Sequence, residues 1–210
     1  MYIFYAMLFG LYLYRKNLGS YISKTILKII GYKFEEIDIN TLPSKIVMIG
    51  SHTSIYDFLI GLLYYYAVLH KRYNTYILMK KQFEIFCTPI LSFIDNKFNL
   101  ISIDKTLQKT GLTTKICATL KNKDDYLLFI APEGTRKCTE TLRSGYWYIA
   151  QNLDIDIIYF GIDFSAKTIV LEKSRKTKDT WEEEQMEFIN SCQKYVPLYP
   201  ERCYWMQNYY

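Results

Sequence analysis

The sequence predicts an α/β fold with a mixed, mostly parallel central sheet flanked by helices, preceded by a hydrophobic N-terminal segment. Short β-branched runs alternate with longer helical runs from residue 34 onward, and strands separated by helices favour parallel neighbours. Half of the 210 residues are hydrophobic and only 9 are Gly and 5 are Pro, a composition typical of a folded chain. The length fits one domain with a substantial core.

The N-terminal run has no charged residue over positions 1–14 and is followed by Arg15 and Lys16. A helix of that length reaches about 21 Å, which is short for a hydrocarbon core of roughly 30 Å. A signal peptide places its charges before the apolar run, so we do not expect cleavage.

The next stretch, Tyr21–Ile30, interleaves isoleucines with Lys24 and Lys28. This pattern favours an amphipathic helix lying in a membrane interface. The alternative is a helix packed on the domain's own core. We therefore assign residues 1–33 to a membrane-associating helical segment and residues 34–210 to one α/β domain.

The strands and helices of the domain are predicted from hydrophobic residues that recur every two positions in strands and every 3.6 positions in helices. In order, they are a strand at 45–50, a helix over 55–70, strands at 74–80 and 100–105, a helix over 106–123, a strand from 125 that runs into a loop, a helix at 145–153, strands at 154–164 and 167–173, and an acidic helix from about 179 to 196.

Net charge and cysteine content exclude few classes of protein. The net charge of +5 suits an anionic partner such as a lipid headgroup, a cofactor phosphate or nucleic acid. The five cysteines lie far apart, without a CxxC pair or a zinc-site spacing. We therefore expect a reducing compartment and no structural metal.

The first polar loop, "GSHTSIYD", follows the strand at 45–50 and contains His52 and Asp57. Functional loops of α/β sheets lie beyond the carboxyl ends of strands. Residues five apart on a helix are rotated by roughly 140°, so the two side chains meet only if His52 curls back over the first helical turn. Asp57 would then orient one ring nitrogen, and the other would take a proton from a hydroxyl. The alternative is a loop histidine beside an ordinary first-turn acid.

The second polar loop, "APEGTRK", follows the strand that begins at residue 125. Pro132 stiffens its entry and Gly134 permits close backbone approach. Arg136 offers a planar fork suited to a phosphate, and the Thr135 hydroxyl adds a donor. The alternative is a surface turn with a Glu133–Arg136 salt bridge.

These two loops together resemble the 1-acylglycerol-3-phosphate acyltransferase (PlsC-like) glycerolipid acyltransferase superfamily. "SHTSIYD" is similar to its first motif, NHxSxxD, and "APEGTRK" to its third, FPEGTRS. "LISIDK", with Asp104 and Lys105, is similar to the strand between these motifs, and "IDIIYFGIDF" to the fourth block. Ser51 stands where asparagine is usual in the family, and Lys105 stands where arginine is common.

The resemblance implies that residues 34–210 form an acyltransferase domain of phospholipid biosynthesis. A fatty acyl group would pass from acyl-CoA or acyl carrier protein to the hydroxyl of a lysophospholipid, with 1-acylglycerol-3-phosphate becoming phosphatidic acid. His52 and Asp57 would be catalytic. The implied substrate-binding residues are Glu133, Gly134, Thr135, Arg136 and Lys105.

The implied partners are membrane lipids, the acyl donor and the lysophospholipid acceptor, with no metal and no cofactor beyond the acyl co-substrate. The expected location is a membrane, with the active site at its cytosolic face.

Three other interpretations stay open. The acceptor headgroup could differ, as in lysophospholipid remodelling, because Lys105 keeps a charge but lacks the bidentate geometry of arginine. The chain could be a membrane lipid-binding homologue without turnover, or a hydrolase in which His52 activates water. Nucleic-acid binding is not expected, because the basic residues do not cluster and no recognition motif occurs.

Overall fold

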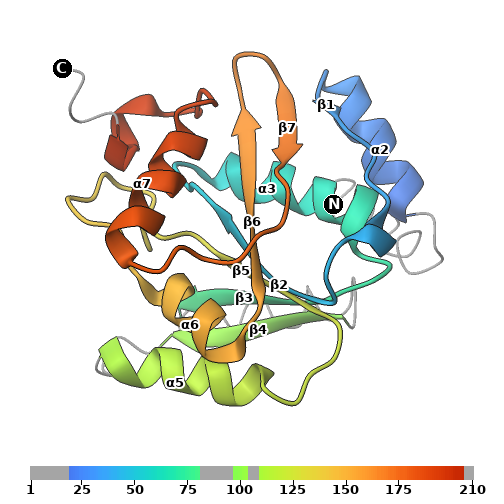
Figure 1. The fold of residues 1–210 in the computed structure, drawn as a ribbon. Coiled ribbons are helices and arrows are strands. Elements are labelled where there is room, and N and C mark those ends of the chain that lie inside the picture. Colours follow the sequence, from blue (N-terminus) through green and yellow to red (C-terminus); the bar gives the residue numbers. More distant parts are fainter. Residues whose placement is uncertain (1–18, 81–96, 104–108, 206–210) are drawn as a thin grey trace.

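A seven-stranded sheet lies between two layers of helices in the computed structural model, which describes residues 19–80, 97–103 and 109–205 (Figure 1). The strand order is β1-β7-β6-β2-β5-β3-β4. The strands are β1 (Lys33–Phe34), β2 (Lys45–Gly50), β3 (Asn74–Lys80), β4 (Phe98–Ile103), β5 (Tyr126–Ile130), β6 (Asp156–Asp163) and β7 (Thr168–Leu171).

The sheet is mixed and mostly parallel, as the sequence predicts. β2 lies between β5 and β6 and is parallel to both, and β3 is parallel to β5 and β4. β7 turns back antiparallel to β6, and the short β1 pairs with β7 at the edge.

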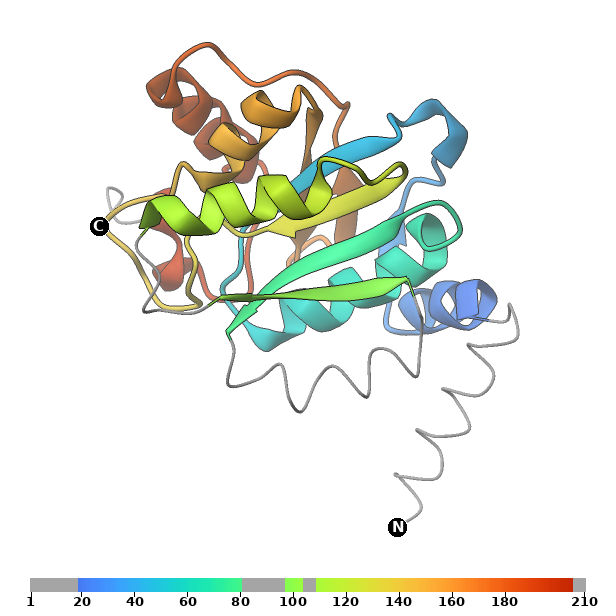
Figure 2. The same ribbon diagram turned by 90° about the horizontal axis from the view of Figure 1, so that it is seen from below.

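Helices cover both faces of the sheet (Figure 2). One face carries α2 (Gly19–Ile29), α3 (Ile55–Tyr64) and a π-helical turn (Tyr65–Leu69), and the other carries α5 (Lys109–Leu120), α6 (Gly145–Leu153) and α7 (Trp181–Cys192). Short 3-10 turns span Ile39–Thr41 and Pro200–Arg202.

Strand β2 shows why both faces need cover. Its side chains alternate, with Ile46 and Met48 in the core beneath α3 and with Val47 and Ile49 in the core beneath α6. All four are 5% exposed or less, so β2 is a central strand buried on both faces.

Element boundaries differ from the sequence-based ones in a few places. The helix predicted over 55–70 is α-helical only to Tyr64 and ends in the π-helical turn. The acidic helix is shorter than predicted at both ends. It begins at Trp181, because Thr180 caps it by accepting a hydrogen bond from the Glu183 amide, and it ends at Cys192. Strand β1 was not predicted, since two residues carry no period-two signal.

Helix α2 packs on the domain and also presents apolar side chains to the outside. Leu27 is fully buried, and Ser20 donates a hydrogen bond to the Ala67 carbonyl of the π-helical turn (2.8 Å). Tyr21 and Ile29 are 72% and 78% exposed. The alternative of a helix packed on the domain's own core is therefore confirmed for one side of α2, and the interfacial position of its other side stays a prediction.

The predicted hydrophobic run over residues 1–14 lies outside the described residues. Within the described part of the chain, no helix has the length and apolar content needed to span a bilayer.

Helix α7 is fixed to the sheet by a buried carboxylate. Glu184 is fully buried and accepts hydrogen bonds from the Tyr159 hydroxyl (2.6 Å), the Tyr146 hydroxyl (3.3 Å) and the Lys178 amide (2.9 Å). Arg175 completes the network with an ion pair at 3.1 Å. A buried charge with this many partners sets the position of α7 and of the chain that follows it.

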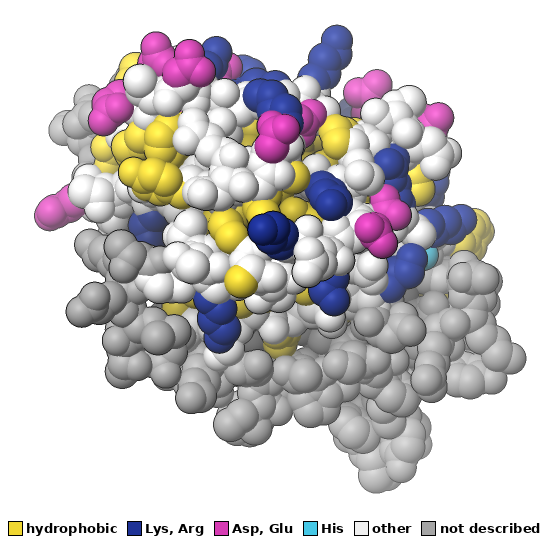
Figure 3. Space-filling model, turned by 60° about the horizontal axis from the view of Figure 1, so that its bottom comes forward, with side chains coloured by type: hydrophobic (Ala, Val, Ile, Leu, Met, Phe, Trp, Pro, Cys, Tyr) yellow, Lys and Arg dark blue, Asp and Glu magenta, His cyan; other side chains and the backbone are white. Residues whose placement is uncertain are grey.

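Charged side chains are dispersed over the face shown in Figure 3. Lysines and arginines there stand among acidic and apolar side chains, so the net positive charge is not gathered into one patch on that face.

Candidate active site

The two polar loops meet because the strands that carry them are neighbours. β2 and β5 are parallel and in register, with Ile49 opposite Ile130, so both strands end at the same edge of the sheet. The Ser51 hydroxyl donates a hydrogen bond to Glu133 Oε1 across 2.8 Å. Residues 82 apart in the chain are thereby joined at this edge.

His52 and Asp57 lie together at the start of α3. His52 Nδ1 is 3.4 Å from Asp57 Oδ2, and the two side chains are 27% and 10% exposed. Ser54 makes this possible, because its extended backbone (φ −147°, ψ 169°) ends the loop and its side chain caps α3 in a capping box with Asp57. His52 therefore lies in the loop and turns back over the first helical turn.

The Asp57 carboxylate is held by donors from its own loop. Oδ2 accepts hydrogen bonds from the amides of Thr53 and Ser54, each at 2.6 Å, and Oδ1 accepts one from the Ser54 hydroxyl at 3.1 Å. These bonds and the helix N-terminus favour a fixed negative charge beside His52 Nδ1. This contact leaves His52 Nε2 as the nitrogen that can exchange a proton with a substrate.

Glu133 points into the protein. Its side chain is 3% exposed, and burial raises the pKa of its carboxyl, an effect that hydrogen bonds from its own amide and Ser51 and the nearby His52 partly oppose. Oε2 has no hydrogen-bond partner among the described residues. Glu133 thus joins the second loop to the first, while the exposed end of its loop carries Arg136.

The sequence of the second loop explains its shape. The Gly134 amide donates to the Ala131 carbonyl (3.0 Å), which closes a β-turn with Pro132 at its second position. Gly134 has φ +62°, a conformation in which a side chain costs energy. A Cβ there would come within 2.9 Å of the Arg143 guanidinium.

Two arginines border this turn. Arg136 is exposed, and no described residue forms an ion pair or hydrogen bond with its guanidinium. Arg143 lies over Gly134, and its amide donates to the Pro132 carbonyl (3.0 Å). Sequence reasoning missed Arg143, although a basic residue just before α6 and soon after "PEGTR" was a usable signal.

Two predicted binding residues remain, Thr135 and Lys105. The Thr135 hydroxyl accepts a hydrogen bond from the Lys137 amide (3.2 Å). Lys105 lies outside the described residues.

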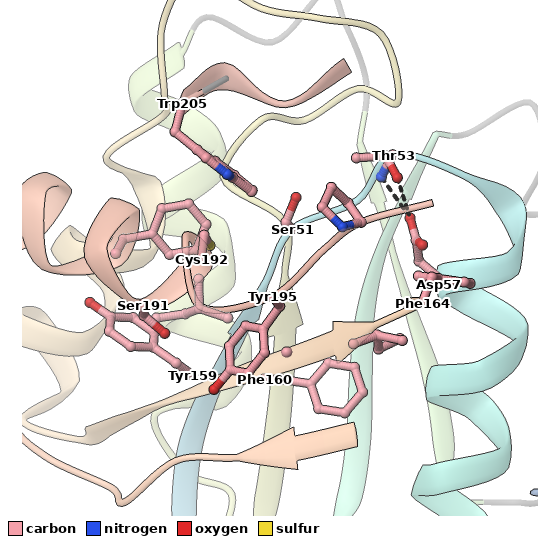
Figure 4. Close-up of a pocket in the computed structure, with 15 residues that line it drawn as sticks. Ser51, Thr53, Asp57, Tyr159, Phe160, Phe164, Ser191, Cys192, Tyr195 and Trp205 are labelled. Carbon is pink, nitrogen blue, oxygen red and sulfur yellow. Dashed lines mark hydrogen bonds between the residues drawn. The ribbon is translucent and has the colours of Figure 1, made fainter. Parts of the chain in front are cut away.

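A cleft opens behind the first loop, between β6 and the C-terminal segment after α7 (Figure 4). Its polar wall is Ser51, Thr53 and Asp57. Most of its other lining is apolar or aromatic: Ile49, Tyr159, Phe160, Ile162, Phe164, Phe188, Tyr195, Pro197 and Trp205. No functional role was predicted from the sequence for the C-terminal residues among them.

Tyr195 narrows this cleft. Its ring lies so close to the backbone of β6 that a Cβ at Gly161 would come within 2.3 Å of it. The Tyr195 hydroxyl donates to Glu172 Oε1 (3.2 Å), which fixes the ring in this position.

The two cysteines nearest the site are poor nucleophiles. Burial raises the pKa of the Cys203 thiol to about 12 and also raises that of Cys192, and the nearby Glu133 carboxyl acts in the same direction on both. Both side chains therefore stay as thiols near neutral pH. Among the described residues, no cluster of histidine, cysteine and carboxylate side chains is suited to hold a metal ion.

The α/β fold has a histidine-aspartate pair at the carboxyl edge of its sheet, next to a turn bordered by two arginines. This arrangement defines a candidate enzyme of general acid-base chemistry. Residues 33–163 match the family model described as Acyltransferase, which is more than half of the chain. The chain therefore belongs to the PlsC-like glycerolipid acyltransferase family. No curated protein and no solved structure matches it.

Proposed function

We propose that this chain transfers a fatty acyl group from acyl-CoA or acyl carrier protein to the hydroxyl of a lysophospholipid, with 1-acylglycerol-3-phosphate giving phosphatidic acid. The family assignment supports glycerolipid acyltransferase activity at the coarser level. The observation that carries the finer proposal is the His52–Asp57 contact beside a turn that Arg136 and Arg143 border.

In this reaction His52 Nε2 removes the proton of the acceptor hydroxyl as its oxygen attacks the thioester carbonyl. The tetrahedral intermediate then collapses and the carbon–sulfur bond breaks. The leaving sulfur accepts from His52 the proton that came from the acceptor hydroxyl. Asp57 supports the imidazolium that exists between these steps. The acceptor hydroxyl is itself the nucleophile, so no acyl-enzyme forms.

Arginine side chains suit the phosphate of the acceptor. Arg136 is exposed and uncommitted, Arg143 stands over the same turn, and each offers a planar fork of donors. The apolar cleft beside Asp57 suits methylene groups of the acyl chain.

A membrane location fits the surface around the site. The first turns of α3, directly after the catalytic loop, expose Ile55, Tyr56 and Leu59. On α2, Tyr21 and Ile29 are exposed near Lys24 and Lys28. Apolar side chains next to lysines favour an interface of anionic lipids, where lysophospholipids and acyl chains are found.

The test is transfer of radiolabelled acyl groups from acyl-CoA to lysophosphatidic acid in liposomes. We compare wild type with His52→Ala and use His70→Asn, at the only other histidine, as the matched control. Diacyl product from wild type and from His70→Asn, but not from His52→Ala, supports the proposal. Release of free fatty acid that does not depend on the acceptor indicates hydrolysis, and product from His52→Ala refutes the assigned base.

The membrane proposal is tested by flotation of the full chain with anionic liposomes. We expect Tyr21→Ser and Ile29→Ser together to reduce binding, whereas Met186→Ser on α7, which removes a side chain that is 59% exposed, leaves it unchanged. Point changes suit this test better than deleting residues 1–31, because deletion would also remove the buried Leu27. Equal binding by all variants would refute this role of α2.

A further inference from the structure

A C-terminal segment, residues 199–205, is anchored behind the catalytic loop. It contains the 3-10 turn Pro200–Arg202, and its Cys203 and Trp205 are 0% and 4% exposed. The Trp205 ring packs edge-on against Phe188 of α7, with centroids 6.3 Å apart. The segment lies beyond residues 33–163, which match the family. Burial of Cys203 and the contact of Trp205 with Phe188 fix the position of the segment, and with it that of Arg202.

Arg202 reaches the catalytic loop directly. Its guanidinium Nη1 donates a hydrogen bond to the Thr53 carbonyl over 3.1 Å, across 149 residues of sequence. The guanidinium also lies over the Tyr199 ring at 4.0 Å, and Nε is 3.7 Å from a Glu201 carboxylate oxygen. Stacking on Tyr199 limits the rotation of this long side chain.

The bond to Thr53 acts on Asp57 through one peptide group. The Thr53 carbonyl and the Ser54 amide belong to the same peptide unit, and the Ser54 amide donates to Asp57 Oδ2 at 2.6 Å. A cationic donor at the carbonyl oxygen polarises the peptide, which makes its N–H a stronger donor. Asp57 Oδ2 is also the oxygen that faces His52 Nδ1.

From this chain of contacts we infer that Arg202 is a positioning residue for the acyl transfer: through the Thr53–Ser54 peptide it holds Asp57 in the orientation that His52 requires. This inference rests on the proposed function. Arg202 touches neither the reacting atoms nor the arginine-bordered turn, so its loss lowers kcat and leaves KM for donor and acceptor unchanged.

The experiment uses the full chain in liposomes with Arg202→Ala, Arg202→Lys and the control Glu182→Gln, at an exposed acid of α7. We expect kcat of Arg202→Ala to fall about tenfold, the usual effect of losing one hydrogen bond from a charged donor. Arg202→Lys keeps the charge and one donor and recovers most of the rate, and methylguanidine added to Arg202→Ala recovers part of it. Glu182→Gln keeps the wild-type rate.

A measurement without substrate separates this inference from the proposed function. The chain has two histidines, so NMR of histidine labelled with ¹⁵N gives two sets of ring signals, which His52→Ala assigns. Arg202→Ala is expected to shift the His52 signals and to leave those of His70 in place, even if wild type transfers no acyl group to any acceptor tested. Unchanged His52 signals overturn the inference. A fall in kcat that neither lysine nor methylguanidine restores also overturns it, because the segment would then act only through folding.

Discussion

Replacing Ser51 by alanine removes the hydrogen bond between the two polar loops and leaves both oxygens of Glu133 without a side-chain partner among the described residues. The bond is 2.8 Å long and ends on a carboxyl that is 3% exposed, and Oε2 already lacks a partner. At pH values above the folded pKa of Glu133, where its carboxyl is ionised, a hydrogen bond to this charged group contributes about 1.5–3 kcal/mol. We therefore expect Ser51→Ala to lower the free energy of unfolding by that amount.

The partner variant Glu133→Gln removes the buried charge and keeps an acceptor oxygen for Ser51. In that background the same Ser51→Ala change costs about 1 kcal/mol, the value of a neutral hydrogen bond. The double-mutant cycle should therefore give a coupling free energy of about 0.5–2 kcal/mol.

The pH dependence of stability follows from the direction of the Glu133 pKa shift. Burial raises this pKa above its ordinary value of 4.5, so the folded state keeps the proton at pH values where the unfolded chain has lost it. The contribution of Glu133 to stability is complete below pH 4.5 and is lost as the pH rises through the folded pKa. Glu133→Gln should reduce this loss of stability with rising pH. Ser51→Ala removes a hydrogen bond that lowers the Glu133 pKa, so in this variant the loss of stability should extend to higher pH.

Urea unfolding of the four proteins at several pH values, extrapolated linearly to water, measures these quantities. Coupling indistinguishable from zero would mean that the charge of Glu133 adds nothing to its hydrogen bond with Ser51. A fall in stability of the same slope in wild type and Glu133→Gln would refute the account of the pH dependence.

Three further predictions concern the surroundings of the site. Gly134→Ala should lower stability by about 1–2 kcal/mol, because of its left-handed backbone, and should displace Arg143, raising KM for the acceptor in steady-state kinetics. Tyr195→Ala should shift the preference toward longer acyl-CoA donors in competition assays, because the ring narrows the apolar cleft; an unchanged chain-length profile would exclude the cleft as the acyl site. Glu184→Ala should cost about 3–5 kcal/mol in urea unfolding, since it breaks a buried ion pair, whereas the exposed Glu183→Ala on the same turn should cost about 1 kcal/mol or less.

Most strands and helices were predictable because their hydrophobic residues recur with a clear period. Lys45–Gly50, Asn74–Lys80 and Gly145–Leu153 have the predicted boundaries, since buried β-branched runs and a dense apolar helix face leave little choice of register. The same reasoning placed His52 in the loop ahead of its helix, because a helical His52 could not reach Asp57.

The rest of the site depends on contacts between segments distant in sequence. Nothing in the order of residues indicates that Glu133 turns inward to Ser51, or that Arg202 binds the Thr53 carbonyl. Likewise, the sequence does not distinguish Tyr195 from other apolar residues, and only the structure shows that its ring lies against Gly161. Tertiary packing decides these contacts, and a single sequence carries no periodic signal for them.

The division of the site between two parts of the chain has a consequence for how such a protein can change over evolution. The proposed base, its carboxylate and the proposed anion-binding turn all lie within the stretch that matches the family, whereas α7, Tyr195 and Trp205 lie beyond it. Substitutions in that C-terminal part can remodel the wall of the cleft without altering a proton-transferring group. Related enzymes could therefore diverge in substrate specificity while keeping the same reaction mechanism.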